Sequence, residues 1–175
     1  EQVLSFPAPV PLSGPKVHEV EPNDYMDSAN LVEFDGQVVL TGNISAGNSF
    51  DFDTFALGPA EAGDQVVADL VANAGSDVVL GLFDGGFSLL GYVNYSRGIA
   101  APGRISVVLR ESVDTLYVVA GTRSTAQADR SYSIGVTVTP GAAIPAPNPQ
   151  IVVLNFIGAS GVRIGRRAAV NVPPF

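Results

Sequence analysis

Several residue types and patterns are scarce in this chain, and each scarcity excludes a class of protein or site. Cysteine is absent, which excludes disulfides and thiol chemistry. His18 is the single histidine, so a zinc centre built from histidine and cysteine is almost excluded. No apolar run approaches the ~20 residues that a membrane-spanning helix needs, so we expect no membrane span.

Positive charge is also scarce. The chain has nine Lys and Arg residues and 17 Asp and Glu residues, which gives a net charge of −8. Nucleic-acid binding needs a basic surface, so this composition argues against it. Hydrophobic residues make up 46% of the chain and charged residues only 15%, so the chain can fold around a core. Its 175 residues suit one domain with extensions. The acidic balance fits a secreted protein, or one whose carboxylates are partly neutralised by metal.

Short β-rich runs follow one another at regular intervals from Gln37 onward. Residues 131–138 alternate strictly between apolar and polar side chains, which indicates a strand with one buried face. Asp84-Gly85-Gly86 is typical of a hairpin turn. The predicted strands are 37–44, 51–57, 65–72, 77–84, 88–94, 103–110, 114–121 and 131–139. Eight short strands predict an all-β, antiparallel, jelly-roll-like β-sandwich.

Proline-rich segments divide the chain into four parts. Residues 1–17 form a proline-rich lead, 18–140 the sandwich, and 141–150 a second proline-rich linker. Residues 151–175 begin with an apolar run, 151–156, that resembles a strand, and continue into a basic tail with Arg163, Arg166 and Arg167. We interpret this last part as the start of a further, truncated domain, or as a strand that docks on the sandwich.

An acidic stretch, Glu19–Asp24, precedes the first predicted strand. Pro22 favours an extended conformation at Glu21, so Glu19 and Glu21 are expected to share a face. Asp51 and Asp53 form a second alternating pair. Oxygen ligands at this density, with no Lys or Arg among them, suit a hard cation such as Ca²⁺.

The plainer interpretation of the acidic stretch is a solvated linker that ends in a helix cap. Residues 25–31 are expected to form one short helical turn, with Asn23 or Asp24 as its N-cap. A cap leaves the other carboxylates unexplained. An EF-hand starting at Asp51 is excluded, because Ala62 occupies the position where a bidentate Glu is needed.

No catalytic motif is complete in this sequence. His18-Glu19 lacks the second histidine of a zinc protease. Residues 158–162 match neither the nucleophile elbow nor the dinucleotide fingerprint, and we interpret residues 158–161 as a linker or loop. Asp84 and Asp114 are more simply turn residues than an acid–base pair. We therefore expect no enzymatic activity from these residues alone.

The segment from His18 to Thr139 resembles the bacterial pre-peptidase C-terminal (PPC) domains, which include the collagen-binding domains of clostridial collagenases. The matching elements are Glu19–Asp24 followed by Ala29 and Leu31, then Thr41–Ile44, Asp51–Phe55, Leu80–Gly86 and Leu116–Val119. The resemblance implies a jelly-roll sandwich that is a non-catalytic accessory of a secreted enzyme, often a protease. The aromatic cluster of collagen-binding members has no counterpart at residues 120–124, so collagen affinity is not implied.

The resemblance also implies a set of calcium ligands. Carried over by position, they are Glu19, Glu21, Asn23, Asp24 and Asp51, with the backbone oxygen of Thr41. Asn48 and Asp53 are further candidates.

Together these observations predict a secreted bacterial protein, extracellular or on the cell surface, whose partners are a covalently linked neighbouring domain and an extracellular polymer. Its expected role is a calcium-binding accessory module that aids stability, secretion or attachment. The alternative is a carbohydrate- or fibrous-protein-binding adhesion module without metal, for which Tyr92 and Tyr95 are the candidate binding residues. A third possibility is that these residues precede a catalytic part beginning near Ile151.

Overall fold

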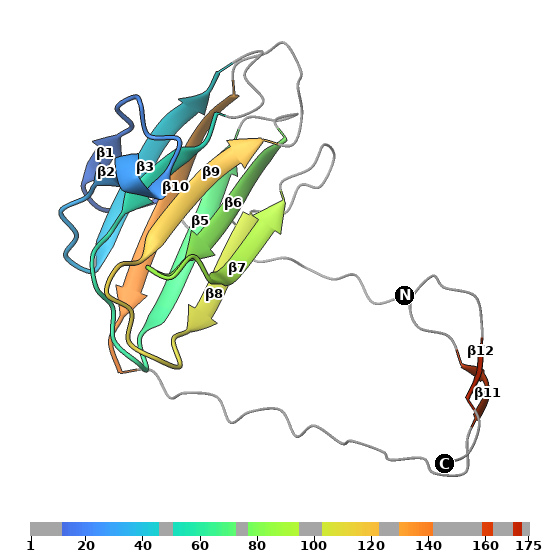
Figure 1. Cartoon of the computed structure of the whole chain (residues 1–175). Coiled ribbons are helices and arrows are strands. Elements are labelled where there is room, and N and C mark those ends of the chain that lie inside the picture. Colours follow the sequence, from blue (N-terminus) through green and yellow to red (C-terminus); the bar gives the residue numbers. More distant parts are fainter. Residues whose placement is uncertain are drawn as a thin grey trace, which may run out of the picture. The chain divides into compact units, whose positions relative to one another are not determined.

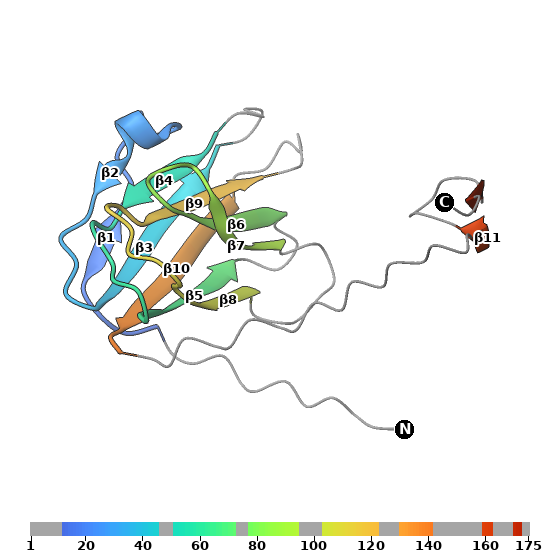
Figure 2. The same ribbon diagram turned by 60° about the horizontal axis from the view of Figure 1, so that its bottom comes forward.

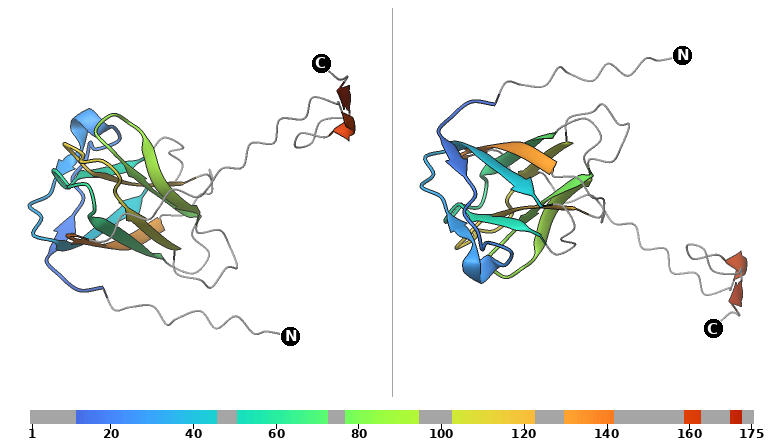
Figure 3. Two further views of the ribbon diagram at one scale, coloured as in Figure 1. Left: turned by 90° about the horizontal axis from the view of Figure 1, so that it is seen from below. Right: turned by 90° about the horizontal axis from the view of Figure 1, so that it is seen from above.

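The computed structural model describes residues 12–45, 51–72, 77–94, 103–122, 130–141, 159–162 and 170–172. The chain divides into two compact units, Glu1–Pro145 and Ala146–Phe175, which we describe separately. The first unit is a β-sandwich of two five-stranded sheets (Figure 1). The sheets form two separate layers in Figure 2 and in both views of Figure 3. Among the described residues, no helix has the length and apolar character needed to cross a membrane.

Each sheet draws its strands from distant parts of the chain. The first sheet runs in the order β1 (Lys16–His18), β3 (Gln37–Ile44), β10 (Arg130–Thr139), β5 (Gln65–Ala72) and β8 (Gly103–Val108). The second runs in the order β2 (Asn30–Leu31), β4 (Asp53–Ala56), β9 (Tyr117–Thr122), β6 (Val78–Phe83) and β7 (Leu89–Asn94).

The eight strands from β3 to β10 have the pairing of a jelly roll. β3 pairs with β10, β4 with β9, β5 with β8 and β6 with β7, all antiparallel. Successive pairs belong to alternate sheets, as in one long hairpin rolled into two layers. The predicted jelly-roll sandwich is confirmed, and these eight strands lie within two or three residues of the predicted ranges. The sheets are nevertheless mixed, because β1 joins β3 and β2 joins β4 in parallel.

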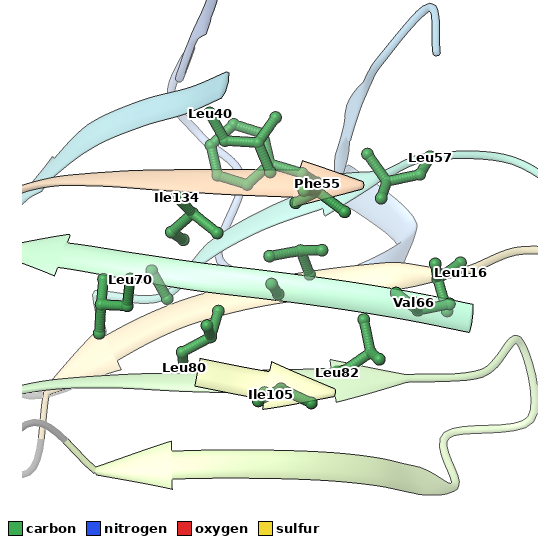
Figure 4. Close-up of a cluster of buried hydrophobic side chains, with 14 of the residues drawn as sticks. Leu40, Phe55, Leu57, Val66, Leu70, Leu80, Leu82, Ile105, Leu116 and Ile134 are labelled. Carbon is green, nitrogen blue, oxygen red and sulfur yellow. The ribbon is translucent and has the colours of Figure 1, made fainter. Parts of the chain in front are cut away.

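Alternation along the strands places apolar side chains between the two sheets. In β5, Val66, Ala68 and Leu70 are fully buried, whereas the residues between them are partly exposed. Leu80 and Leu82 of β6 face them from the other sheet (Figure 4). The remaining labelled core residues also come from both layers and their connecting loops: Leu40, Phe55, Leu57, Ile105, Leu116 and Ile134. This continuous apolar core supplies the main driving force for folding.

The last residues of the predicted lead belong to the sandwich. Val39 N donates to Pro15 O at 2.8 Å, and β1 continues this pairing along β3. Leu12 lies flat on β10 at Gly135, where a Cβ atom would come within 2.5 Å of its Cδ2. The lead therefore begins to pack on the first sheet before residue 18.

One short helical turn near the N-terminus is present, as expected, but its cap differs from the prediction. It is a 3₁₀ helix, η1 (Met26–Ser28), preceded by Tyr25 at the cap position. Ser28 Oγ accepts a hydrogen bond from Tyr25 N at 3.2 Å and donates one to Tyr25 O at 3.1 Å. The expectation that Asn23 or Asp24 caps this turn was wrong, because both residues bond to more distant partners.

The second unit contains a two-stranded antiparallel pair, β11 (Ala159–Val162) and β12 (Val170–Val172). Residues 159–161, interpreted from sequence as linker or loop, are therefore part of a strand. The sequence could not indicate this because the partner strand lies beyond the motif. The predicted strand at 151–156 and the arginines at 163, 166 and 167 lie outside the described residues.

Candidate metal centre

Two acidic segments that are thirty residues apart in sequence meet at one end of the sandwich. Glu21, Asp51 and Asp53 each offer a carboxylate oxygen, and these three oxygens lie within 4.8 Å of one another. Glu21 belongs to the acidic stretch, while Asp51 and Asp53 lead into β4. The structure thus brings together three of the residues proposed as ligands, in a cluster that could hold a metal ion.

Glu19, another predicted ligand, is anchored to the first sheet. Its backbone N donates to Thr41 O at 2.9 Å, and its Oε1 accepts from Asn43 N at 2.8 Å. Tyr132 of β10 donates its hydroxyl proton to Oε2 at 3.2 Å. Gly42 leaves room for this contact, because a Cβ atom there would overlap both Glu19 Oε2 and the Tyr132 hydroxyl. These bonds fix the start of the acidic stretch against β3.

Asn30, which sequence reasoning missed, holds the middle of the acidic stretch. Its Oδ1 accepts from Val20 N at 2.7 Å, and its Nδ2 donates to Val20 O at 2.8 Å. The same Oδ1 accepts from Asn23 Nδ2 at 3.1 Å. Asn30 stands between Ala29 and Leu31, but its partners lie seven and ten residues away. No local sequence pattern could have indicated this role.

Direct hydrogen bonds join the acidic stretch to the segment around Asp51. Phe52 N donates to Asp24 Oδ1 at 3.1 Å, and Thr54 N donates to Asn23 O at 3.1 Å. Asp51 Oδ2 accepts from Ser45 N, which ties the carboxylate to the end of β3. Asp51 and Asp53 are both buried, whereas Phe52 between them is 37% exposed.

Two buried side chains at this site carry oxygens that lack hydrogen-bond partners. Asp53 is fully buried, and neither of its carboxylate oxygens is hydrogen-bonded within the part of the chain that the structure describes. Asn23 is also fully buried, and its Oδ1 is likewise unpartnered among those residues. An unpaired buried polar group costs about 1–3 kcal/mol, and a charged one costs more. A cation bound between these oxygens would remove that cost.

The proton affinities of the site reflect the same crowding of acidic groups. Burial, together with the neighbouring Glu19 and Asp51 carboxyls, raises the pKa of Asp53 to about 9, against a lowering by the nearby Tyr132 hydroxyl. Burial and the charges of Asp51, Asp24 and Glu19 also raise the pKa of Glu21, against a lowering by the Asn23 N–H. The pKa of Tyr132 is raised by burial and by Asp53 and Glu19, so this hydroxyl remains a donor. These shifts all favour a positive charge at the site.

The donor set and spacing fit a hard divalent cation. Every candidate donor is an oxygen, the atom that Ca²⁺ prefers. Because Ca²⁺ binds oxygen at about 2.3–2.6 Å, two oxygens on one ion lie at most about 4.6–5.2 Å apart. The 4.8 Å spread of Glu21, Asp51 and Asp53 falls within that limit.

Two other predicted ligands, Asp24 and Thr41, are not part of the three-carboxylate cluster. Asp24 Oδ1 is bonded to Phe52 N, and Thr41 O already accepts the Glu19 N–H. Asn48 and Tyr95 lie outside the described residues.

A second surface feature, which we call the apolar hollow, lies on the outer face of the second sheet. The Phe83 ring covers Gly81 and the Phe52 ring covers Gly121, where added Cβ atoms would come within 2.6 and 2.5 Å of the rings. Leu89 and Tyr92 remain 55% and 58% exposed. The hollow measures about 210 Å³ and is lined by Phe52, Val79, Gly81, Phe83, Leu89, Tyr92, Val119 and Gly121.

Comparison with known proteins identifies no family. No family model matches the chain, and no curated protein matches it. Among solved structures, the chain is similar to Aeromonas hydrophila PliG, a periplasmic lysozyme inhibitor of g-type lysozyme. The TM-score is 0.49 at 14% sequence identity, and the match covers 63% of this chain and 96% of PliG.

Proposed function

We propose that the first unit is a calcium-binding, non-catalytic accessory module of a secreted bacterial enzyme, of the PPC type that its sequence resembles. The observation that carries the proposal is Asp53, fully buried with both oxygens unpartnered among the described residues, beside Glu21 and Asp51. A clustered acidic surface alone would be unremarkable. A buried carboxylate without a partner is stabilised by a proton or by a bound cation, and we propose that calcium takes this role when it is present.

Calcium at this site would tie the acidic stretch to β4. The hydrogen bonds from Phe52 and Thr54 already link these segments, and a shared ion would relieve the repulsion between Glu21, Asp51 and Asp53. Metal that binds only the folded protein adds RT ln(1 + [L]/Kd), roughly 2.7 kcal/mol at a hundredfold excess over Kd. The module would thereby gain stability outside the cell, where calcium is plentiful, next to the neighbouring domain to which it is linked.

The proposal is tested by thermal melts of the whole chain in excess EDTA and in millimolar calcium, with magnesium as the control ion. We expect a calcium-specific rise in Tm that Glu21→Ala and Asp51→Ala abolish. Glu33→Ala, which removes an exposed carboxylate outside the cluster, should keep the full rise. An identical Tm in EDTA and calcium would refute the metal function.

The apolar hollow favours a second candidate function, the attachment of an extracellular polymer. Exposed apolar patches of this kind commonly mark interaction sites, and aromatic faces can stack on the rings of a polysaccharide. If the hollow binds a polymer, Tyr92→Ala should abolish retention of the protein on an insoluble polysaccharide, because it removes the most exposed ring of the hollow. The measurement is a pull-down with chitin, cellulose and fibrous collagen.

The matched control for this pull-down is Tyr25→Ala, which removes a tyrosine that is 69% exposed and lies outside the hollow. It should leave retention unchanged. Equal loss in both variants would show non-specific adhesion, and no retention of the wild type on any of the three polymers would reject the candidate.

A further inference from the structure

We propose that Asn30 is a positioning residue of the metal centre, which fixes the Asn23 side chain so that its amide oxygen is the atom free to bind the cation. This inference rests on the proposed calcium function and extends it to a residue outside the predicted ligand set. The Asn30 side chain is hydrogen-bonded to Val20 and Asn23, and it makes no described hydrogen bond to the cluster carboxylates.

The orientation of the Asn30 amide follows from the backbone of Val20. The Val20 N–H can only donate, so the atom facing it at 2.7 Å must be Asn30 Oδ1. The Val20 carbonyl can only accept, so the atom facing it at 2.8 Å must be Asn30 Nδ2. A flipped Asn30 amide would place donor against donor and acceptor against acceptor. Side-chain amides are often ambiguous, but these two bonds remove the ambiguity.

The orientation of Asn23 follows in turn from Asn30. Because Asn30 Oδ1 can only accept, its neighbour at 3.1 Å must be the Asn23 amide nitrogen. Asn23 Oδ1 is therefore the atom on the other side of this amide, and it is the buried oxygen that lacks a partner among the described residues. A cation needs an oxygen here, since an NH₂ group would repel it.

Asn23 is also held beside the cluster through its backbone. Its N–H donates to Glu21 Oε2 at 3.0 Å, and its carbonyl accepts from Thr54 N of β4. Asn30 itself pairs with Phe55 of β4. The backbone thus sets the position of Asn23, and the Asn30 side chain sets which atom of its amide is presented. Loss of such an outer-shell partner typically costs 10–100-fold in metal affinity.

The test is a calcium titration of the whole protein by calorimetry, on wild type, Asn30→Ala, Asn23→Ala and the double variant. We expect Asn30→Ala to weaken calcium binding by about 10–100-fold. In the Asn23→Ala background, adding Asn30→Ala should weaken binding no further, because the group that Asn30 orients is already gone. Gln65→Ala removes a side-chain hydrogen bond to Ser106 in the first sheet and should bind like wild type.

Asn30→Asp separates orientation from simple stability. It keeps an oxygen that accepts from Val20 N and Asn23 Nδ2 but loses the bond donated to Val20 O. We expect it to bind calcium more tightly than Asn30→Ala although it is not more stable in EDTA. If Asn30→Ala does not fold, Asn30→Ser takes its place in the cycle.

Three results would overturn the inference. Wild-type affinity in a folded Asn30→Ala would show that Asn23 needs no orientation. Additive losses in the double variant would show that Asn30 acts only through general stability. A blank wild-type titration would reject the calcium function itself and the inference with it, and this outcome is distinct because it appears before any substitution is made.

Discussion

At the scale of single residues, the site depends on one glycine. Gly42 lies in the middle of β3, a place where glycine ordinarily weakens a strand. Here its bare Cα leaves the space in which Tyr132 donates to Glu19. That bond anchors the start of the acidic stretch, so the lack of a side chain at residue 42 helps to set the position of the Glu19 carboxylate.

We predict that Gly42→Ala destabilises the protein by about 1–3 kcal/mol and weakens calcium binding, because the new methyl group displaces Glu19 or Tyr132. Urea unfolding and a calcium titration measure the two effects. Gly85→Ala is the matched control, since a Cβ there would be 3.7 Å from its nearest neighbour, an ordinary contact. Equal stability of the two variants would contradict the prediction.

Asp53 gives the metal-free protein a specific dependence on pH. The pKa of this carboxyl is about 9 in the folded state against 3.8 ordinarily, so folding favours its protonated form. Its contribution is therefore complete below about pH 4 and is lost as the pH rises towards 9. In EDTA we expect the free energy of unfolding to fall between pH 5 and pH 8, by at most about 1.4 kcal/mol per pH unit from this group.

Urea unfolding in EDTA at several pH values measures this slope. Asp53→Asn cannot ionise and should be distinctly less sensitive to pH over the same range. An equal slope in the wild type and Asp53→Asn would assign the pH dependence to other groups and contradict the prediction.

At the scale of elements, calcium is expected to act on the contact between the acidic stretch and β4. Two amides bridge these elements, Phe52 N to Asp24 and Thr54 N to Asn23. We predict that calcium slows hydrogen exchange at both amides, because the ion joins the same two segments. Ala62 N, which donates to Ser112 Oγ in another loop, should exchange at an unchanged rate. Uniform slowing of all three amides would indicate global stabilisation instead.

The main strands were predictable from sequence because alternation survives wherever one face of a strand is buried. β3 and β5 have the predicted bounds for this reason. β1 and β2 were not predicted, since runs of three and two residues are too short to show a period. They form because β3 and β4 offer open edges to which they pair in parallel.

The candidate site was predictable in part. Alternation through Asp51 and Asp53 indicated that these carboxylates share a side, and the structure places both in one cluster with Glu21. The same alternation turns Phe52 outward into the apolar hollow. Asn30 and Tyr132 could not be found in this way, because they reach the acidic stretch only through folding, Tyr132 from 113 residues away.

At the scale of the whole molecule, the two outer faces of the sandwich differ in chemistry. The outer face of the first sheet presents Ser133 and Thr137, together with the ion pair of Arg104 with Asp69, at 2.6 Å. The outer face of the second sheet carries the apolar hollow. In a chain of net charge −8, an uncharged face is where a partner can approach with least electrostatic cost.

The jelly-roll pairing also determines how the sandwich would respond to mechanical tension. Lys16 of β1 lies opposite Val39, and Thr137 of β10 lies opposite Gln37, so the chain enters and leaves the first sheet at the same end. Pulling the two ends of this unit apart would separate β1 from β3, and β10 from both β3 and β5, one hydrogen bond at a time, which is the geometry of least resistance. The acidic cluster lies beyond the opposite end of β1. An ion bound there would cross-link the acidic stretch to β4 and resist further separation of the strands.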